Sequence, residues 1–209
     1  MGRRRDRLWR SAPASCNGMS KGRLEAFSDG VLAIIITIMV LELKVPDGVT
    51  LDALIRLGPV FLSYLLSFAL LGTYWNNHYH LLQASKVTDG RVLWANLHLL
   101  FWLSLFPFGT AWMGQHAFAP VPTAAYGVLQ LLAGFAYYLL TRALVRVPGQ
   151  PAALAEAIGR DVKGIASLGL YAIATPLSLA VPLAGLAMYG AVVALWLVPD
   201  RRMERAIGR

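Results

Sequence analysis

The sequence predicts an all-α integral membrane protein with six transmembrane helices and both termini in the cytoplasm. Of its 209 residues, 57% are hydrophobic and only 14% are charged, against roughly 25% charged in an ordinary soluble domain. The charges fall in clusters separated by apolar runs, and these runs are long enough to cross a bilayer, which takes ~20 residues. The positive charges gather in alternate connections, the pattern that orients helices in a membrane.

Four apolar runs are each long enough to form one helix. They are Leu24–Val45, Leu54–Gln83, Val92–Met113 and Pro122–Val145. The third and fourth runs are separated by Gly114–Pro122, a polar, proline-broken segment with the composition of a turn. The long uncharged tract around this segment is therefore predicted to be two helices rather than one.

The last uncharged tract, Gly164–Pro199, is too long for one span. It carries Pro182 and Gly185 near its middle and so predicts a hairpin of two short helices. Pro107 and Pro176 lie inside apolar runs. They predict kinks rather than breaks, because neighbouring helices can satisfy the carbonyls that a proline leaves free.

The Lys and Arg residues give the predicted orientation. Of the nineteen, only Lys44 and Arg56 fall in connections on the side opposite the termini, so that side is expected to be extracellular. The predicted organisation is a disordered basic cytoplasmic tail (1–22), a six-helix membrane domain (23–199) with a short interfacial helix in Pro148–Asp161, and a basic cytoplasmic C-terminus (200–209).

Composition also limits the classes of function. The net charge of +8 is compatible with nucleic-acid binding, but the basic residues lie at the ends of apolar runs, which favours a membrane surface instead. A single cysteine, Cys16, excludes a disulfide framework or a cysteine-rich metal site within one chain. We predict a lipid bilayer as the surroundings, and no nucleic acid, cofactor, metal or soluble partner.

The first helix differs from the others because it contains acidic residues. Glu25, Asp29 and Glu42 leave only Gly30–Leu41 uncharged, which spans about 18 Å and is shorter than the hydrocarbon core. This helix is therefore expected away from lipid, with its acids in water-filled vestibules or paired within protein. Ionisable groups at membrane depth point to function, although a structural ion pair or hydrogen-bond centre is an open alternative for Asp29.

With the rotation of 100° per residue of an α-helix, six residues of the first helix fall on one narrow stripe. Ser28 and Asp29 point away from this stripe. Periodicity alone leaves open whether the stripe serves ordinary helix packing or forms a separate functional surface. The stripe consists of Arg23, Phe27, Gly30, Ile34, Thr37 and Leu41.

Polar residues at the cytoplasmic end of the next two helices lie at the depth of Ser28 and Asp29. The second helix ends in TYWNNHYH (Thr73–His80), and the third adds further donors and acceptors. A histidine in this region is a proton-sensing group, a zinc ligand or a hydrogen-bonded packing residue. The residues from the third helix are Trp94, Asn96 and His98.

The pattern Arg23-x-x-x-Phe27-Ser28-Asp29 resembles the Arg-x-x-x-Phe-Ser-Asp signature of the endosomal/lysosomal potassium channel family (transmembrane protein 175 family), in its bacterial six-helix form. The similarity runs along RLEAFSDGVLAIIITIMVLELKVP, through Trp75 and His78, to Asn96 and LHLLFWLSLFPF. It covers about the first half of the chain. The later helices match the family only in number and hydrophobicity.

The resemblance implies a potassium-permeable leak channel, a homotetramer in which four first helices surround a central pore. Potassium would be the permeant ion, and the cell membrane the location. Carried over to this sequence, the apolar constriction falls on Ile34, with Thr37 and Leu41 further along the pore. Apart from the resemblance, Glu42 and Asp47 are expected at the extracellular mouth, where they either raise the local cation concentration or are solvated residues at the end of a loop. The signature residues and their partners would brace the helices together: Arg23, Phe27, Ser28, Asp29, Trp75, His78 and Asn96.

The sequence departs from the family at Ala33, where some members carry a small hydroxyl residue beside the constriction, and Thr37 compensates for this only in part. No Thr-Val-Gly-Tyr-Gly segment occurs, so a filter built from backbone carbonyls is not available. Two alternatives are a small secondary transporter and a proton-coupled membrane protein. An enzyme is not expected and no catalytic residue is assigned, because His78, His80, Asp29 and Glu42 are split between the two membrane faces.

Overall fold

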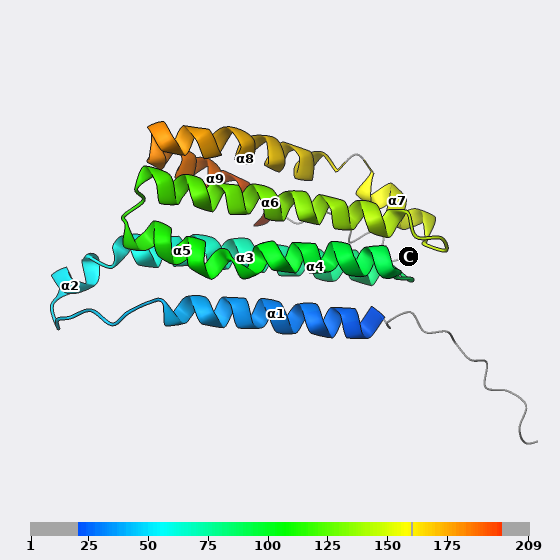
Figure 1. Cartoon of the computed structure of the whole chain (residues 1–209), viewed down its shortest axis with the longest axis horizontal. Coiled ribbons are helices and arrows are strands. Elements are labelled where there is room, and N and C mark those ends of the chain that lie inside the picture. Colours follow the sequence, from blue (N-terminus) through cyan, green and yellow to red (C-terminus); the bar gives the residue numbers. More distant parts are fainter. Residues whose placement is uncertain (1–20, 160, 198–209) are drawn as a thin grey trace, which may run out of the picture.

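The computed structural model describes residues 21–159 and 161–197, and these fold entirely into α-helices and their connections (Figure 1). This agrees with the predicted all-α class. The helices are α1 (Lys21–Leu41), α2 (Leu51–Ile55), α3 (Gly58–Ala84), α4 (Gly90–Ser104), α5 (Phe106–Gln115), α6 (Pro120–Val145), α7 (Ala152–Ile158), α8 (Val162–Ala180) and α9 (Pro182–Leu197).

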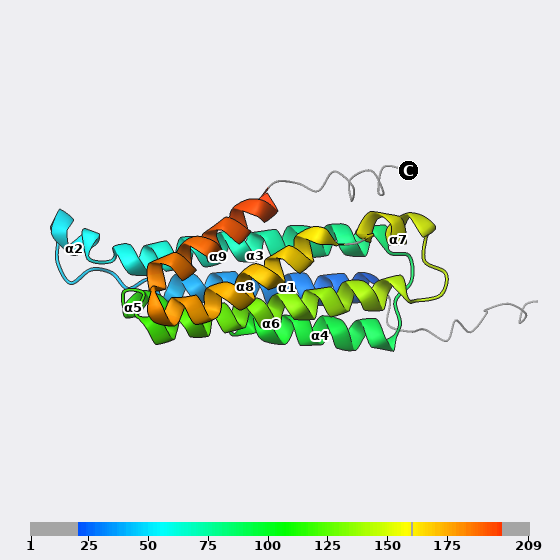
Figure 2. The ribbon, with the colours of Figure 1, turned by 90° about the horizontal axis from the view of Figure 1, so that it is seen from above.

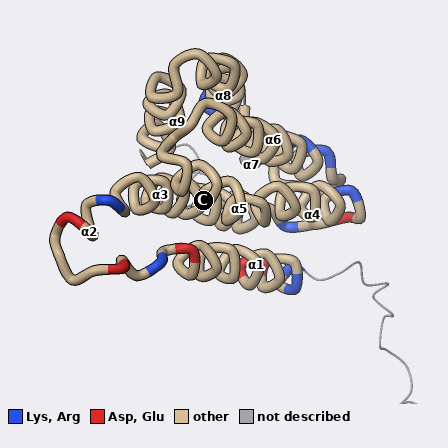
Figure 3. The backbone as a smooth tube through the Cα atoms, turned by 60° about the vertical axis from the view of Figure 1, so that its left-hand side comes forward, with Lys and Arg blue, Asp and Glu red and all other residues tan. Residues whose placement is uncertain are grey.

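The long helices stack in three tiers (Figure 3). Helix α1 forms one outer tier and packs on α3, α4 and α5, which form the middle tier. Helices α6, α8 and α9 form the third tier. Helix α6 contacts α4 and α5 on one side and α8 and α9 on the other, and α9 runs obliquely to the other helices and contacts α3 (Figure 2). As a result, α1 is covered on only one side.

Five helical stretches are long and apolar enough to cross a membrane by length and composition. They are Lys21–Leu41, Gly58–Ala84, Gly90–Gln115, Pro120–Val145 and Val162–Ala180, and Pro182–Leu197 is a shorter apolar helix. The chain is therefore an all-α membrane protein. The sixth span and the cytoplasmic location of both termini stay predictions.

The second predicted helix begins later than the sequence suggested. We expected one helix from Leu54, but Leu51–Ile55 forms the separate α2 and the spanning helix α3 begins at Gly58. Pro59 lies in the first turn of α3, where a missing N–H does no harm because the first amides of a helix have no intrahelical partner. The Gly-Pro pair thus marks the true start of the helix.

The two prolines inside the apolar runs differ in how the helix continues around them. Pro176 lies within α8. Near Pro107 the regular helix is interrupted two residues earlier, at Leu105, and resumes as α5 with the proline in its first turn. In the hairpin, α9 begins at Pro182, but Gly185 is not part of the turn. A Cβ at Gly185 would collide with the Ser178 side chain, so this glycine allows α8 and α9 to pack closely.

The turn after α5 is shorter than the predicted Gly114–Pro122. Helix α5 continues to Gln115 and α6 begins at Pro120, and the tight turn between them holds Ala117 and Phe118 at positive φ. A short helix, α7, does occur within the predicted Pro148–Asp161 loop.

The structure does not describe residues 1–20 and 198–209, so the predicted tails lie outside it except for Lys21 and Gly22. These two residues already belong to α1.

Candidate pore wall and its bracing network

Helix α1 has one face buried against the bundle. Leu24, Ser28, Leu32, Ile35 and Met39 are each at most 4% exposed, and they recur every three or four residues, as on one side of an α-helix. This face packs on α3, α4 and α5. It holds the helix in one rotation about its own axis.

The opposite face of α1 is uncovered in the single chain. All six residues of the predicted stripe are exposed, including Ile34 at 59% and Leu41 at 78%. The hydroxyl of Thr37 donates to the carbonyl of Ile34 across 2.9 Å. Its single proton is therefore used within the helix, and its oxygen lone pairs remain available on the exposed face.

A buried hydrogen-bond chain joins α1 to α3 and α4. The Ser28 hydroxyl donates to the Leu24 carbonyl (2.9 Å), so its oxygen accepts from the Asn96 amide Nδ2 (2.9 Å). The amide oxygen of Asn96 then faces His78 Nε2 at 2.8 Å, and Nε2 must carry the proton because an amide oxygen cannot donate. The donors in this series of hydrogen bonds therefore all point the same way, from His78 through Asn96 and Ser28 to the α1 backbone.

The three side chains of this hydrogen-bond series are buried. Ser28 and Asn96 are 0% exposed and His78 is 3% exposed. Buried polar groups without partners cost about 1–3 kcal/mol each, and satisfied buried networks favour one specific packing arrangement. The structure therefore brings together Ser28, His78 and Asn96, as the sequence suggested, and uses them to fix the rotation of α1.

A second link lies at the edge of the exposed face. The indole Nε1 of Trp75 donates to the Asp29 carboxylate across 3.0 Å, and the Trp75 ring stacks on Tyr79 with 6.2 Å between centroids. Asp29 and Trp75 are both exposed in the single chain. This bond ties α1 to α3 beside Ser28, and it leaves the negative charge of Asp29 on the uncovered side of the helix.

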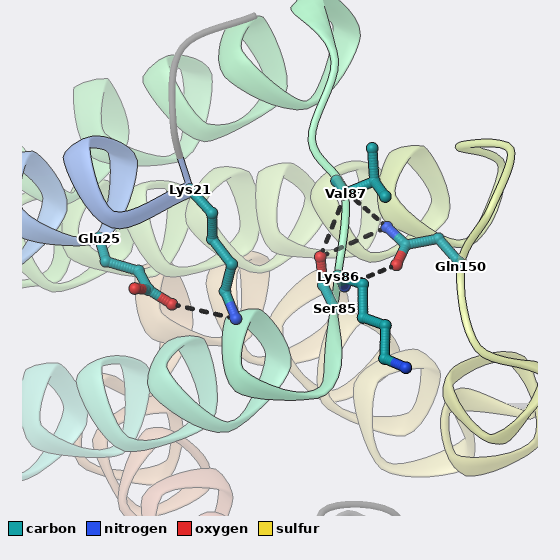
Figure 4. A network of polar contacts seen from close by, with 6 residues as sticks. All are labelled: Lys21, Glu25, Ser85, Lys86, Val87 and Gln150. Carbon is teal, nitrogen blue, oxygen red and sulfur yellow. Dashed lines mark hydrogen bonds and ion pairs between the residues drawn. The ribbon is translucent and has the colours of Figure 1, made fainter. Parts of the chain in front are cut away.

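Two other predicted site residues lie apart from these links. Arg23 is exposed, and in the part of the chain that the structure describes no hydrogen bond or ion pair joins it to Ser28, Asp29 or Trp75. Its neighbour Glu25 pairs with Lys21 at 3.5 Å (Figure 4). Glu42 is half-buried just beyond the last turn of α1, at the opposite end of the helix.

Sequence reasoning missed a deeper polar cluster behind α1. The Ser67 hydroxyl lies 2.7 Å from Thr110 Oγ1 and 2.8 Å from the Tyr126 hydroxyl, and this joins α3, α5 and α6. Thr110 also lies against Met39, on the buried face of α1. Isolated hydroxyls within apolar runs were the only signal in the sequence, and their contacts depend on tertiary packing.

A polar clamp at the end of the bundle where α1 begins was also missed. The Gln150 amide accepts from the Lys86 backbone N–H at 3.0 Å and donates to the Val87 carbonyl at 2.7 Å. Figure 4 shows Gln150 reaching from the loop after α6 to the loop between α3 and α4. One side chain therefore fixes these two loops together.

The polar contacts of this region join helices to one another. Within the described residues, no three His, Cys, Asp or Glu side chains are grouped so that they could hold a metal ion. His78 is occupied by Asn96. Asp29 lies in the first half of α1 and Glu42 just beyond its last residue, which separates them by about 20 Å along the helix axis, so they do not converge on one site.

Comparison with known proteins identifies the family. The family model described as "endosomal/lysosomal potassium channel TMEM175" matches residues 23–107. This segment runs from the start of the signature to the first turn of α5. A potassium channel of Chryseobacterium sp. (strain P1-3) is 48% identical over 189 residues, which cover 90% of this chain and 98% of the relative.

More distant relatives agree. The human endosomal/lysosomal proton channel TMEM175 is 41% identical over 96 residues, 40% of this chain and 19% of the human protein. The crystal structure of a lysosomal potassium-selective channel TMEM175 homologue from Chamaesiphon minutus superposes with a TM-score of 0.71 at 27% identity, covering 86% of this chain and 97% of that chain. The family model spans α1 from Arg23 onward and the bracing residues, and with the relative that is 48% identical over 90% of this chain it shows that the chain belongs to the TMEM175 family.

Proposed function

We propose that this chain is the subunit of a potassium-permeable, leak-type cation channel, a homotetramer in which four copies of α1 line the pore. One observation carries the proposal: α1 is locked to the bundle by its buried face while its opposite face, centred on Ile34, is uncovered. The bacterial relative at 48% identity, which is named a potassium channel, supports the same assignment.

The composition of the uncovered face argues against contact with lipid. It carries Arg23 and Thr37 beside its apolar residues and has Asp29 at its edge, and charged side chains at membrane depth face water or protein rather than lipid tails. A closed ring of copies gives these groups a water-filled axis and neighbouring subunits. Four copies is the number that the bacterial six-helix form of the family implies.

The proposed constriction is a ring of four Ile34 side chains. An apolar ring of this kind controls conduction by dewetting, and it favours potassium over sodium because potassium gives up its weaker hydration more readily. Thr37 would present hydroxyl oxygens one turn further along, followed by Leu41. Glu42 at the extracellular mouth would raise the local concentration of cations.

The relatives also supply a second candidate for the permeant ion. The human relative is named a proton channel, so protons are a second ion to test in the same pore. A small secondary transporter remains the rival mechanism, although the described helices show no pair of broken spans at mid-membrane of the kind that transporters use. We place the protein in the cell membrane as a multi-pass homotetramer without a soluble partner or bound cofactor.

The test is purified protein in a planar bilayer, with potassium on one side and sodium on the other. We expect single-channel currents that reverse at a potential displaced towards potassium equilibrium. A pH gradient imposed in a second recording separates proton from potassium permeation by its own reversal potential. Absence of single-channel current from protein shown to be tetrameric by native mass spectrometry would contradict the proposal.

A further inference from the structure

An arm of the chain stands apart from the helical bundle. It comprises residues 42–57, which connect α1 to α3 and include α2. Figures 1 and 2 show α2 beyond the end of α3, away from the other helices. Its large apolar side chains are unprotected, and Val49 is completely exposed at 106%. The exposed set is Val45, Val49, Leu51, Leu54 and Ile55.

The arm carries three acidic and two basic side chains, which argues against a simple membrane anchor. Asp52 and Arg56 form an ion pair at 2.8 Å within α2 and its cap. Lys44 and Asp47 are exposed, and neither has an ion pair with any residue that the structure describes. Surface anchors attract anionic lipid through clusters of positive charge. The arm has no such cluster. Besides the half-buried Glu42, it offers one exposed unpaired charge of each sign, Lys44 and Asp47.

An apolar groove lies at the base of the arm. It is formed where the end of α1, α2 and the start of α3 meet, and Lys44 is its charged lining residue. Val49 of the same chain does not fill it, since that side chain is fully exposed. The apolar lining is Leu43, Leu54, Leu57, Val60 and Phe61.

We propose that the arm docks on a second copy of this chain: Val49 enters the groove of the partner subunit, and Asp47 pairs with Lys44 of the partner subunit. The inference rests on the proposed homotetramer. It is supported by the complementary charges and by continuity, because the arm follows directly on from the uncovered face of α1. A contact between two different patches, the arm tip and the groove, is heterologous, and it closes into a ring when the rotation between copies is one quarter of a turn, as in the proposed tetramer.

Cross-linking between two differently tagged chains tests the contact. One chain carries Val49→Cys and the other Phe61→Cys, both have Cys16→Ser, and the two are co-expressed and oxidised. We expect a disulfide-linked heterodimer of the two tags and only background 49–49 and 61–61 products, because the contact is heterologous. Tags on separate chains exclude a bond within one chain. A tetramer without the 49–61 product, or with 49–49 as its main product, would overturn the proposal.

Charge reversal provides an independent measurement. Lys44→Asp and Asp47→Lys are each expected to lower the tetramer fraction several-fold in native mass spectrometry, and the double variant K44D/D47K is expected to restore it. Asp52→Lys is the matched control, since it disturbs only the pair within α2 and should leave the tetramer fraction unchanged. An equal loss in the control, or no rescue by the double variant, would contradict the proposed pair.

The two proposals fail in distinguishable ways. Tetramers that conduct but give no 49–61 product would leave the channel intact and refute the arm contact. Protein without any oligomer or current would refute the proposed function and the arm contact together.

Discussion

Nδ2 of Asn96 lies 2.9 Å from Oγ of Ser28, and this bond ties α4 to α1 at a point where both side chains are fully buried. Ile34 lies on the other side of the same helix. A helix held by a directional hydrogen bond on one face cannot rotate freely on the other. The position of Ile34 therefore depends on contacts made some distance from it.

Replacing Asn96 by Ala is expected to destabilise the fold. The change leaves His78 Nε2 and the Ser28 oxygen without their buried partner, at about 1–3 kcal/mol for each group. The midpoint of thermal unfolding in detergent should fall by several degrees. Trp94→Ala, at an exposed position of the same helix, is the control and should change the midpoint little. An unchanged midpoint for Asn96→Ala would show that the hydrogen bonds of Asn96 do not brace α1.

Asp29→Ala is expected to weaken both the fold and the tetramer. It removes the acceptor of the Trp75 indole, and hydrogen bonds to charged groups contribute about 1.5–3 kcal/mol. Asp29→Asn keeps an oxygen in the same place and should retain more of the thermal stability. Native mass spectrometry and thermal unfolding measure the two effects, and equal behaviour of wild type and Asp29→Ala would argue against the link.

Thr37→Val is expected to change ion preference without changing stability. The side chains have similar shape, and the lost hydroxyl bonds only to its own helix backbone. The change removes oxygen from the exposed face, so we expect a smaller difference between potassium and sodium permeability. Reversal potentials under bi-ionic conditions test this. A large drop in unfolding temperature would mean instead that Thr37 has a packing role.

Gly127→Ala is expected to disturb the packing of α6 against α8 and α9. A Cβ at this position would collide with the Tyr189 and Thr175 side chains, and overpacking of this kind costs about 1–3 kcal/mol. Gly169→Ala, with no atom within 4 Å of the added Cβ, is the matched control. Thermal unfolding should separate the two variants, and equal stability would show that the tyrosine is free to move aside.

The sequence was informative where one helix carries its own signal. The acids and the period of residues 23–42 correctly separated Ser28 from the stripe around Ile34, and a depth argument placed His78 and Asn96 near Ser28. Hydropathy could not locate the start of α3, because α2 is also apolar. Pro59 was the available signal, since proline is favoured in the first turn of a helix.

Contacts between distant hydroxyls could not be predicted. Ser67, Thr110 and Tyr126 are single polar residues in three apolar runs, and their meeting depends on the rotation of each helix in the bundle. The same holds for Gln150, whose partners are more than sixty residues away. Periodicity fixes which residues share a face, but not which faces meet.

The central claim is that Ile34 forms the constriction of a conducting pore. The most direct measurement compares single-channel currents of Ile34→Asn and Ile173→Asn with wild type in a planar bilayer. Ile173 lies on α8 and is 60% exposed, almost the same as Ile34 at 59%, so it controls for a polar group on a membrane helix. We predict that Ile34→Asn raises conductance several-fold and moves the reversal potential towards zero in opposing potassium and sodium, while Ile173→Asn changes neither. Conductance and reversal potential that stay at wild-type values in Ile34→Asn would contradict the account.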